Sequence, residues 1–412
     1  MKAVVFHNVG DIRLEEVANP KIQNSQDAIV RLTASAICGT DLHMVRGTMP
    51  GMKSGTILGH EGVGIIEEIG RNVRNFKPGD RVVIASTIAC GYCVYCRAGY
   101  FSQCDHANPN GKDEGTAFFG GPAASGPFHG MQAEKVRVPF AHVGLVKIPD
   151  NVTDDQAITV SDIFPTGYFG AELADIHDGK IVSVFGCGPV GLFTIISAKL
   201  MGAGRIIAID HLPDRLEKAQ ELGAESINFD KENPVDTILD ITGGIGTDCA
   251  VDAVGVDAEP PESKWQQWKN KVSGKEEQQK EQIKKAVPKQ NPDGELWNPG
   301  GAPTQAIEWA VDSVAKAGTI SITGVYTKKI QNFPLGKAMR KNLTLRMGNC
   351  NHRKYIPMLL DLISAGIVDP LKVLSHQEPL SDAIEAFKAF DRRDLGWIKV
   401  VLDPTNSKEN KK

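Results

Sequence analysis

The chain has 412 residues, of which 41% are apolar and 23% charged, and its formal net charge is −4. A chain of this length is expected to fold as two or three domains. The near-neutral charge gives no reason to expect nucleic acid or anionic lipid as a partner, and no apolar run approaches the roughly 18 residues that span a membrane. With no secretory signal segment either, we expect a cytoplasmic protein that acts on a small molecule.

The first part of the chain, to about residue 160, is predicted to consist of short strands separated by turns. Four runs are rich in β-branched residues: Met1–Phe6, Ala28–Leu32, Gly62–Ile69 and Arg81–Ala85. The sequence Lys77-Pro78-Gly79-Asp80 predicts a turn between the last two runs. Because glycines are frequent in this part, we expect irregular, mostly β structure.

Two separated residues in this part are candidate metal ligands. Cys38 lies in Cys-Gly-Thr-Asp-Leu-His, and His60 lies in Gly-His-Glu. Taken singly, Cys38 could be a core thiol and His60 a turn residue. Together they indicate a metal with an open position, because catalytic zinc takes three protein ligands and leaves the fourth to water or substrate.

Four further cysteines form one short loop with the spacing C-x2-C-x2-C-x7-C, within about residues 86–105: Cys90, Cys93, Cys96 and Cys104. Glycines in the gaps let the chain turn back, so four thiolates can surround a zinc ion at about 2.3 Å. Disulfides or unrelated buried thiols are the alternatives. Eight cysteines in 412 residues without a signal segment favour metal. A site closed by four thiolates predicts a structural zinc.

A different pattern begins near residue 178. The apolar run Ile181–Phe185 precedes a glycine turn at Gly186, Gly188 and Gly191, and a helical pattern over Leu192–Leu200 precedes the strand Arg205–Asp210. Such a βαβ unit builds a parallel sheet, and its turn presents backbone N–H groups to a pyrophosphate. Asp210 is placed to bind a ribose 2′-OH and repel a 2′-phosphate, which favours NAD over NADP. The alternative is a glycine turn that binds no ligand.

The least ordinary segment is the insertion Val256–Pro303. Its centre, Glu259–Lys289, is rich in Lys, Glu and Gln and predicts a solvated helix or a flexible loop. It also contains Trp265, Trp268 and Trp297, so we expect part of it to dock. A cover over the adenosine half of the cofactor and a subunit contact remain equal alternatives.

Taken in order, the Cys-Gly-Thr-Asp-x-His and Gly-His-Glu motifs, the four-cysteine loop and the glycine turn resemble the zinc-dependent medium-chain alcohol dehydrogenases over nearly the whole chain. The Gly39 beside Cys38, the long insertion and an Asp162 where many members have Cys are similar to the glutathione-independent formaldehyde dehydrogenase branch. The resemblance implies a catalytic zinc held by Cys38, His60 and Asp162, two zinc ions per chain, and NAD. Asp162 could instead cap the helix that follows it.

The resemblance also implies roles for residues around these ligands. Thr40 would accept the substrate proton and His43 would pass it on, while Glu61 is either an alternative zinc ligand or a carboxylate beside the ligands. The residues expected to bind the cofactor are Thr166, Gly186, Gly188, Pro189, Val190, Gly191, Asp210, Arg215, Val325 and Lys399. Lys399 stands where the family usually has an Arg for the pyrophosphate, so it supplies the charge without the bidentate fork.

The implied architecture is α/β, with a GroES-like, mostly β catalytic domain formed by residues 1–162 and 349–412. A doubly wound, parallel-sheet Rossmann domain, residues 163–348, carries the insertion 256–303, and the active site is expected in the cleft between the two. The implied function is hydride transfer between NAD and a small alcohol or hydrated aldehyde, in a homo-oligomer, dimer or tetramer. A polyol or amino-alcohol dehydrogenase, or a non-enzymatic NAD sensor, are the alternatives. The intact set of proposed ligands and relay residues argues against the sensor.

Overall fold

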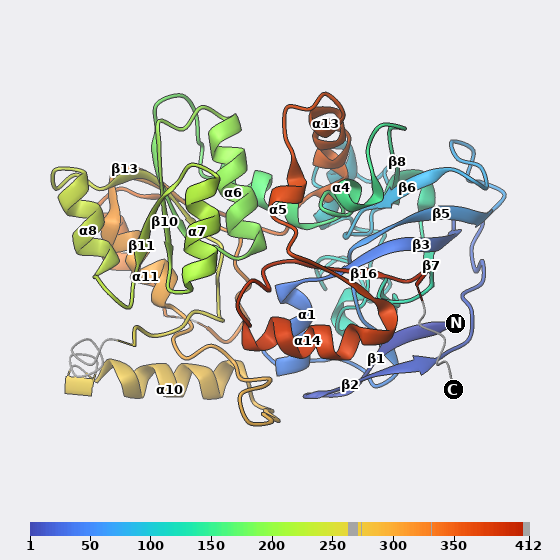
Figure 1. Cartoon of the computed structure of the whole chain (residues 1–412), viewed down its shortest axis with the longest axis horizontal. Helices are drawn as coiled ribbons and strands as arrows, with labels where there is room; N and C mark the ends of the chain where they lie inside the picture. Colours follow the sequence, from blue (N-terminus) through green and yellow to red (C-terminus); the bar gives the residue numbers. More distant parts are fainter. Residues whose placement is uncertain (263–270, 273, 331, 407–412) are drawn as a thin grey trace. The chain divides into compact units, whose positions relative to one another are not determined.

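The computed structural model describes residues 1–262, 271–272, 274–330 and 332–406 and divides into two compact units. Unit 1 comprises Met1–Pro165, Gln290–Trp297 and Asn349–Lys412, and unit 2 comprises Thr166–Lys289 and Asn298–Gly348. Each unit has its own sheet and its own core, as the change of pattern near residue 178 predicted (Figure 1).

Unit 1 is built on a seven-stranded, largely antiparallel sheet in the order β15-β16-β3-β5-β6-β8, with β7 paired to β3. Its strands are β3 (Ala28–Ile37), β5 (Gly62–Ile69), β6 (Arg81–Ile84), β7 (Lys135–Val138), β8 (Leu145–Lys147), β15 (His376–Pro379) and β16 (Val400–Asp403). β5 coincides with the predicted strand, and β3 continues five residues beyond the predicted end at Leu32. These five additional residues extend the strand as far as the residue before Cys38.

A second, three-stranded sheet in the order β2-β1-β4 joins β1 (Lys2–Asn8), β2 (Asp11–Glu16) and β4 (Thr56–Ile57). The helices of unit 1 are α1 (Gly39–Arg46), α2 (Val94–Arg97), α3 (Ala141–Gly144), α4 (Asp154–Ile158), α13 (His352–Ser364) and α14 (Ala383–Arg392). Short 3₁₀ turns cover Phe101–Gln103, Ala123–Ser125, Pro370–Lys372 and Leu380–Asp382. The thiol loop packs into the apolar cluster formed by β3, β5 and β6.

Unit 2 is a six-stranded parallel sheet in the order β11-β10-β9-β12-β13-β14, flanked by helices (Figure 1). The strands are β9 (Ile181–Phe185), β10 (Arg205–Asp210), β11 (Glu225–Asn228), β12 (Thr247–Asp252), β13 (Val314–Ile322) and β14 (Thr344–Met347). The helices are α5 (Ile163–Leu173, which begins in unit 1), α6 (Pro189–Leu200), α7 (Pro213–Glu221), α8 (Pro234–Ile241), α10 (Lys275–Ala286), α11 (Gln305–Ser313) and α12 (Leu335–Arg340). The strand order, which reverses beside β9, is that of a doubly wound Rossmann sheet.

The glycine turn lies between β9 and α6, as predicted, and two of its glycines are sterically required. Gly186 has φ of 91°, a conformation that disfavours other residues. A Cβ on Gly191 would collide with the carbonyl oxygen of Gly186. Only glycine therefore lets α6 start this close to the end of β9.

The insertion divides between the two units. α10 forms a helix with a solvated Lys/Glu/Gln face in unit 2, one of the two structures predicted for Glu259–Lys289. The segment Gln290–Trp297 belongs instead to unit 1, where Trp297 is 4% exposed in the cluster around Phe387. Docking of part of the insertion is thus confirmed through Trp297, although its docking on unit 1 was not foreseen. Trp265 and Trp268 lie outside the described residues.

This segment is held by polar contacts as well as by packing. The backbone N–H of Trp297 donates to Asp391 Oδ2 at 2.7 Å, and Arg46 Nε donates to Asp391 Oδ1 at 2.7 Å. Asn291 donates to the carbonyl of Val9. Buried Asp391, on α14, therefore connects the insertion to α1, the helix that follows Cys38.

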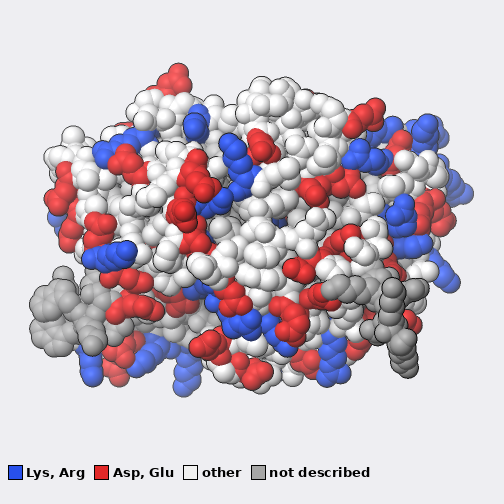
Figure 2. Space-filling model, viewed as in Figure 1, with Lys and Arg blue, Asp and Glu red and all other residues white. Residues whose placement is uncertain are grey.

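On the face shown in Figure 2, Lys and Arg side chains are interspersed with Asp and Glu among the described residues. Of the helices in the described part of the chain, none is both long and apolar enough to cross a bilayer.

Candidate metal and cofactor sites

The four-cysteine loop brings all its thiols together. Ligand atoms of Cys90, Cys93, Cys96 and Cys104 lie within 4.8 Å of one another, and all four residues are buried. None of the eight cysteines of the chain is in a disulfide, so the alternative of disulfide pairs is not realised here. Cys93 caps the N-terminus of the short helix α2, whose first turn brings Cys96 to the same centre.

Backbone N–H groups point at these sulfurs, as a thiolate site requires. Cys96 N–H donates to Cys93 Sγ at 3.5 Å, and Cys93 N–H donates to Cys90 Sγ at 3.4 Å. Burial raises the pKa of Cys93, but donors from the backbone of Cys96 and Asp105 outweigh it and lower the pKa to about 6. Burial instead raises the pKa of Cys90 and Cys96, an effect that a bound cation would reverse. Four converging sulfurs suit a tetrahedral zinc.

The second cluster joins residues that the sequence separates widely. Ligand atoms of Cys38, His60, Glu61 and Asp162 lie within 4.8 Å of one another, and all four residues are buried. Asp162 Oδ2 lies 3.6 Å from Cys38 Sγ and 3.5 Å from His60 Nε2. The three residues predicted to bind the catalytic zinc therefore meet at one point in unit 1.

Cys38 and His60 are both fixed by Asp41. Cys38 directly follows β3 and is the N-cap residue of α1, and its backbone N–H donates to Asp41 Oδ2 at 2.9 Å. The other oxygen, Asp41 Oδ1, lies 3.2 Å from His60 Nδ1, and Gln132 donates to Oδ2. This contact is an ion pair without hydrogen-bond geometry, and it places a carboxylate beside Nδ1 while Nε2 faces the cluster. Sequence reasoning quoted Asp41 within the motif but assigned it no role.

Lys399 lies beside the second cluster. Its side chain is 0% exposed, and its ammonium donates to Glu61 Oε1 at 2.6 Å and to the carbonyl of Ile37 at 2.9 Å. These two partners hold the ammonium in unit 1, and the pyrophosphate contact of Lys399 stays a prediction. Burial raises the pKa of Glu61 and Lys399 counteracts it, so the two form a compensated pair beside the cluster.

Asp162 has a partner that sequence reasoning missed. His352, at the start of α13, places Nε2 at 2.7 Å from Asp162 Oδ1, and Thr87 Oγ1 lies 3.2 Å from His352 Nδ1. Burial would raise the pKa of Asp162, but hydrogen bonds from His352 and His60 outweigh it and hold the pKa well below its usual value. No local pattern marks His352, because it lies far from Asp162 along the chain.

The donor set of the second cluster fits zinc. Thiolate, imidazole and carboxylate are each zinc ligands, and three protein ligands leave the fourth position open, as in catalytic zinc sites. Glu61 Oε2 is buried without a hydrogen-bond partner, which leaves an unsatisfied acceptor beside these donors. Burial raises the pKa of Cys38, and a bound cation would reverse that effect.

The predicted relay residues lie on α1, directly after Cys38. Thr40 and His43 are three positions apart on this helix and therefore share a face. His43 is buried, and its Nδ1 lies 2.9 Å from Thr48 Oγ1, which itself donates to the carbonyl of His43. This arrangement assigns the ring proton of His43 to Nδ1.

The predicted cofactor residues other than Lys399 lie in unit 2. Gly188 caps α6, Pro189 and Val190 form its first turn, and Val325 pairs with Gly255 beside the ends of β12 and β13. Thr166 lies on α5. Asp210 ends β10 and accepts the N–H groups of Cys187 at 2.7 Å and His211 at 2.7 Å. Burial would raise the pKa of Asp210, but Arg215 and the backbone N–H groups of Cys187 and Leu212 outweigh burial and lower it, so the carboxylate stays charged beside the glycine turn.

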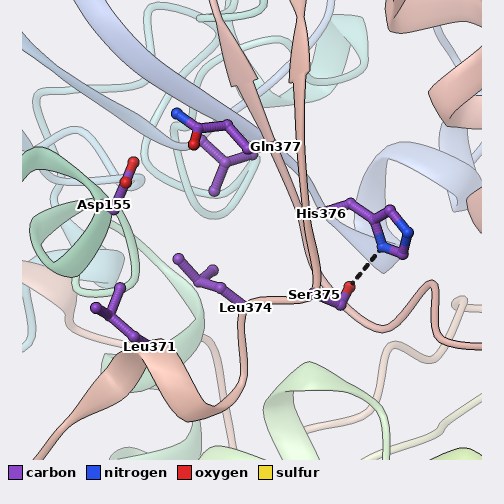
Figure 3. A pocket seen from close by; sticks show the side chains of 7 residues that line it. Asp155, Leu371, Leu374, Ser375, His376 and Gln377 are labelled. Carbon is purple, nitrogen blue, oxygen red and sulfur yellow. Dashed lines mark hydrogen bonds between the residues drawn. The ribbon is translucent and has the colours of Figure 1, made fainter.

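A surface pocket of about 220 Å³ lies elsewhere in unit 1, lined by Asp155, Leu371, Leu374, Ser375, His376, Gln377 and Val401 (Figure 3). His376 Nδ1 is 3.2 Å from Ser375 Oγ and its ring stacks on Trp397 at 4.0 Å. The pocket contains none of the clustered ligands, so it is not the candidate active site.

Comparison with known proteins agrees with these sites. Residues 24–150 match the alcohol dehydrogenase GroES-like domain, and residues 189–260 match the zinc-binding dehydrogenase family. The chain is 38% identical, over 98% of its length and all of the relative, to the uncharacterized zinc-type alcohol dehydrogenase-like protein AdhB of Bacillus subtilis strain 168. It is also 38% identical to the glutathione-independent formaldehyde dehydrogenase of Pseudomonas aeruginosa, over 62% of this chain and 66% of the relative.

Among solved structures, the alcohol dehydrogenase TADH from Thermus sp. ATN1 has a TM-score of 0.78 and 34% identity, over 98% of this chain and 99% of that one. The two matched domains, the full-length relative and this structure agree on a GroES-like unit followed by a Rossmann unit. The chain therefore belongs to the zinc-dependent medium-chain alcohol dehydrogenases, and it is an oxidoreductase of the zinc-type alcohol dehydrogenase class.

Proposed function

We propose that the chain transfers a hydride between NAD and a small alcohol or hydrated aldehyde, with a zinc ion at Cys38, His60 and Asp162. The observation that carries this proposal is the convergence of these three residues, buried and within 4.8 Å of one another and of Glu61. A structural role alone does not require an open, mixed-ligand cluster in addition to the closed thiol loop.

Charge balance supports a divalent ion in this cluster. Ionised Cys38, Asp41, Glu61 and Asp162 would carry four negative charges, and Lys399 supplies one positive charge through its contact with Glu61. A divalent cation would compensate two of the remaining three, and uncompensated buried charge is costly. A zinc ion held there supplies a Lewis acid that lowers the pKa of a substrate hydroxyl.

The surrounding residues bind, orient and move protons. Thr40, two residues after Cys38, accepts the proton of the substrate hydroxyl, and His43, on the same face of α1, passes it toward solvent. Lys399 donates to one oxygen of Glu61, and this contact keeps the Glu61 carboxylate in a fixed orientation beside the ligands. Asp41 fixes both Cys38 and His60.

NAD is the cofactor that unit 2 favours. The glycine turn at the start of α6 offers backbone N–H groups to a pyrophosphate, and Asp210 presents a negative charge where the ribose 2′ position is expected. The low pKa of Asp210 keeps that charge at neutral pH, which disfavours a 2′-phosphate.

The substrate is proposed as formaldehyde-like, on the 38% identity to a glutathione-independent formaldehyde dehydrogenase. A polyol or amino alcohol is the competing class, because a carboxylate ligand such as Asp162 also suits a hydroxylated substrate. NADH formation across short aldehydes, primary alcohols and polyols at equal concentration would separate the two.

Asp162→Ala tests the site. We expect the variant to fold, to bind one zinc rather than two, and to lose about a thousandfold or more in turnover, because a Lewis acid supplies several kcal/mol. Zinc analysis, circular dichroism and NADH formation measure these outcomes. An active Asp162→Ala enzyme, or wild-type protein with a single zinc, would remove the proposed site.

A further inference from the structure

We infer that His352 is a positioning residue that fixes Asp162 for metal binding, and that Thr87 sets the orientation of the His352 ring. This inference rests on the zinc site proposed above and concerns a residue that no sequence motif indicated.

The geometry divides the two oxygens of Asp162 between two tasks. Oδ1 lies 2.7 Å from His352 Nε2, while Oδ2 faces Cys38 Sγ at 3.6 Å and His60 Nε2 at 3.5 Å. A thiolate, the ligand that many family members have at this position, offers a single donor atom. A carboxylate offers two, so one oxygen must be engaged elsewhere if the other is to be presented in one direction.

The hydrogen-bond pattern fixes the ring of His352. Ionised Asp162 can only accept, so Nε2 of His352 carries the proton, and Nδ1 then accepts from the hydroxyl of Thr87 at 3.2 Å. His352 is 4% exposed and Thr87 5% exposed, so water competes little for these contacts. The ring is held between β6, which ends three residues before Thr87, and the first turn of α13.

The cluster thus contains two complementary pairs. His60 is a ligand held by the carboxylate of Asp41, and Asp162 is a ligand held by the imidazole of His352. Partners of this kind typically contribute 10- to 100-fold to metal affinity. A purely structural histidine would affect folding stability without a specific effect on zinc.

The test compares His352→Gln with His352→Asn. The two side chains carry the same amide, but only that of Gln reaches about as far as Nε2 of His. We expect His352→Gln to bind the second zinc within about threefold of wild type, and His352→Asn to bind it about 10- to 100-fold more weakly. Competition for Zn²⁺ with a chelator measures the affinity, and thermal unfolding measures stability. His7→Gln is the matched control, because His7 lies 2.8 Å from Glu15 far along the chain from these ligands.

Asp162→Cys supplies a second, independent test. In this background His352→Asn should cause no further loss of zinc affinity, because a thiolate has a single donor atom and no second atom for His352 to hold. Equal affinities for the Gln and Asn variants, or an unchanged His352→Asn effect in the Asp162→Cys background, would overturn the inference. If wild type itself holds one zinc, the proposed function fails, whereas two zinc ions with an unaffected His352→Asn variant refute only the role of His352.

Discussion

The two metal clusters of unit 1 contrast in how the chain builds them. Cys90 and Cys104, the ends of the thiol loop, are 14 positions apart, whereas Cys38 and Asp162 are 124 apart and Glu61 and Lys399 are 338 apart. The loop has little regular structure of its own, so we expect a bound metal to hold the chain in place. In the second cluster the sheets and helices hold the ligands, so the fold prepares the site for the metal. One metal is therefore expected to support structure, and the other to be exchangeable.

The largest effect on this contrast is expected from Cys90→Ala. Loss of the loop metal should lower the free energy of unfolding by more than about 4 kcal/mol, a change typical of a lost structural metal. Cys249→Ala is the matched control, because Cys249 is equally buried in β12 but belongs to no cluster, and should cost about 1 kcal/mol. Thermal unfolding with zinc analysis measures both, and equal shifts would show that the loop needs no metal.

A chelator should remove the metal of the open site before that of the thiol loop. The open site has a position for an incoming ligand, while four thiolates close the other. We expect a chelator to abolish NADH formation and remove one zinc while the unfolding temperature falls only slightly. Zinc content, activity and unfolding temperature should be followed on the same samples. If zinc content, activity and unfolding temperature fell together, the two sites would not differ in how readily they release their metal.

The glycine turn is, like the thiol loop, a locally encoded site, and a substitution beside it is expected to have a smaller effect. Asp210→Asn keeps an oxygen acceptor for the backbone but removes the charge, so it should narrow the preference for NAD over NADP by about tenfold, as expected for like charges a few Å apart near a surface. The ratio of kcat/KM values for the two cofactors measures the change. Equal use of NADP by the wild-type protein would contradict the role of Asp210.

The smallest effect is expected from the insertion. Replacing residues 260–288 by a Gly/Ser linker, with Gln290–Trp297 retained, should accelerate NAD release severalfold if this part covers the adenosine end. Stopped-flow release and the assembly state measured by light scattering distinguish the two alternatives. Unchanged release from a smaller assembly would identify a subunit contact instead.

The sequence predicts locally encoded features best. The thiol loop, the glycine turn and strands such as β5 and β9 follow from spacing and periodicity, because the residues that cooperate are neighbours in the chain. The convergence of Cys38, His60 and Asp162 was predicted from the resemblance to the alcohol dehydrogenase family, because no local pattern places Asp162 beside Cys38.

The sequence did not reveal which side chains the fold brings into contact with the ligands. Lys399 is a single charge in an apolar run just before β16, and such a residue needs a buried counter-charge. That signal was present in Ile398-Lys399-Val400, but it does not identify Glu61. His352 carries no comparable signal, because its partner is the ligand Asp162 on another element.

The return of Gln290–Trp297 to unit 1 has a practical consequence for recombining domains among relatives. The chain passes between the units four times, at residues 165, 290, 298 and 349, rather than twice. A chimera that takes everything between Pro165 and Asn349 from another dehydrogenase would therefore replace Trp297, whose side chain packs in the cluster around Phe387 and whose backbone N–H donates to Asp391. Such a chimera should retain Gln290–Trp297 of this chain, because their loss would leave a cavity in the core of unit 1.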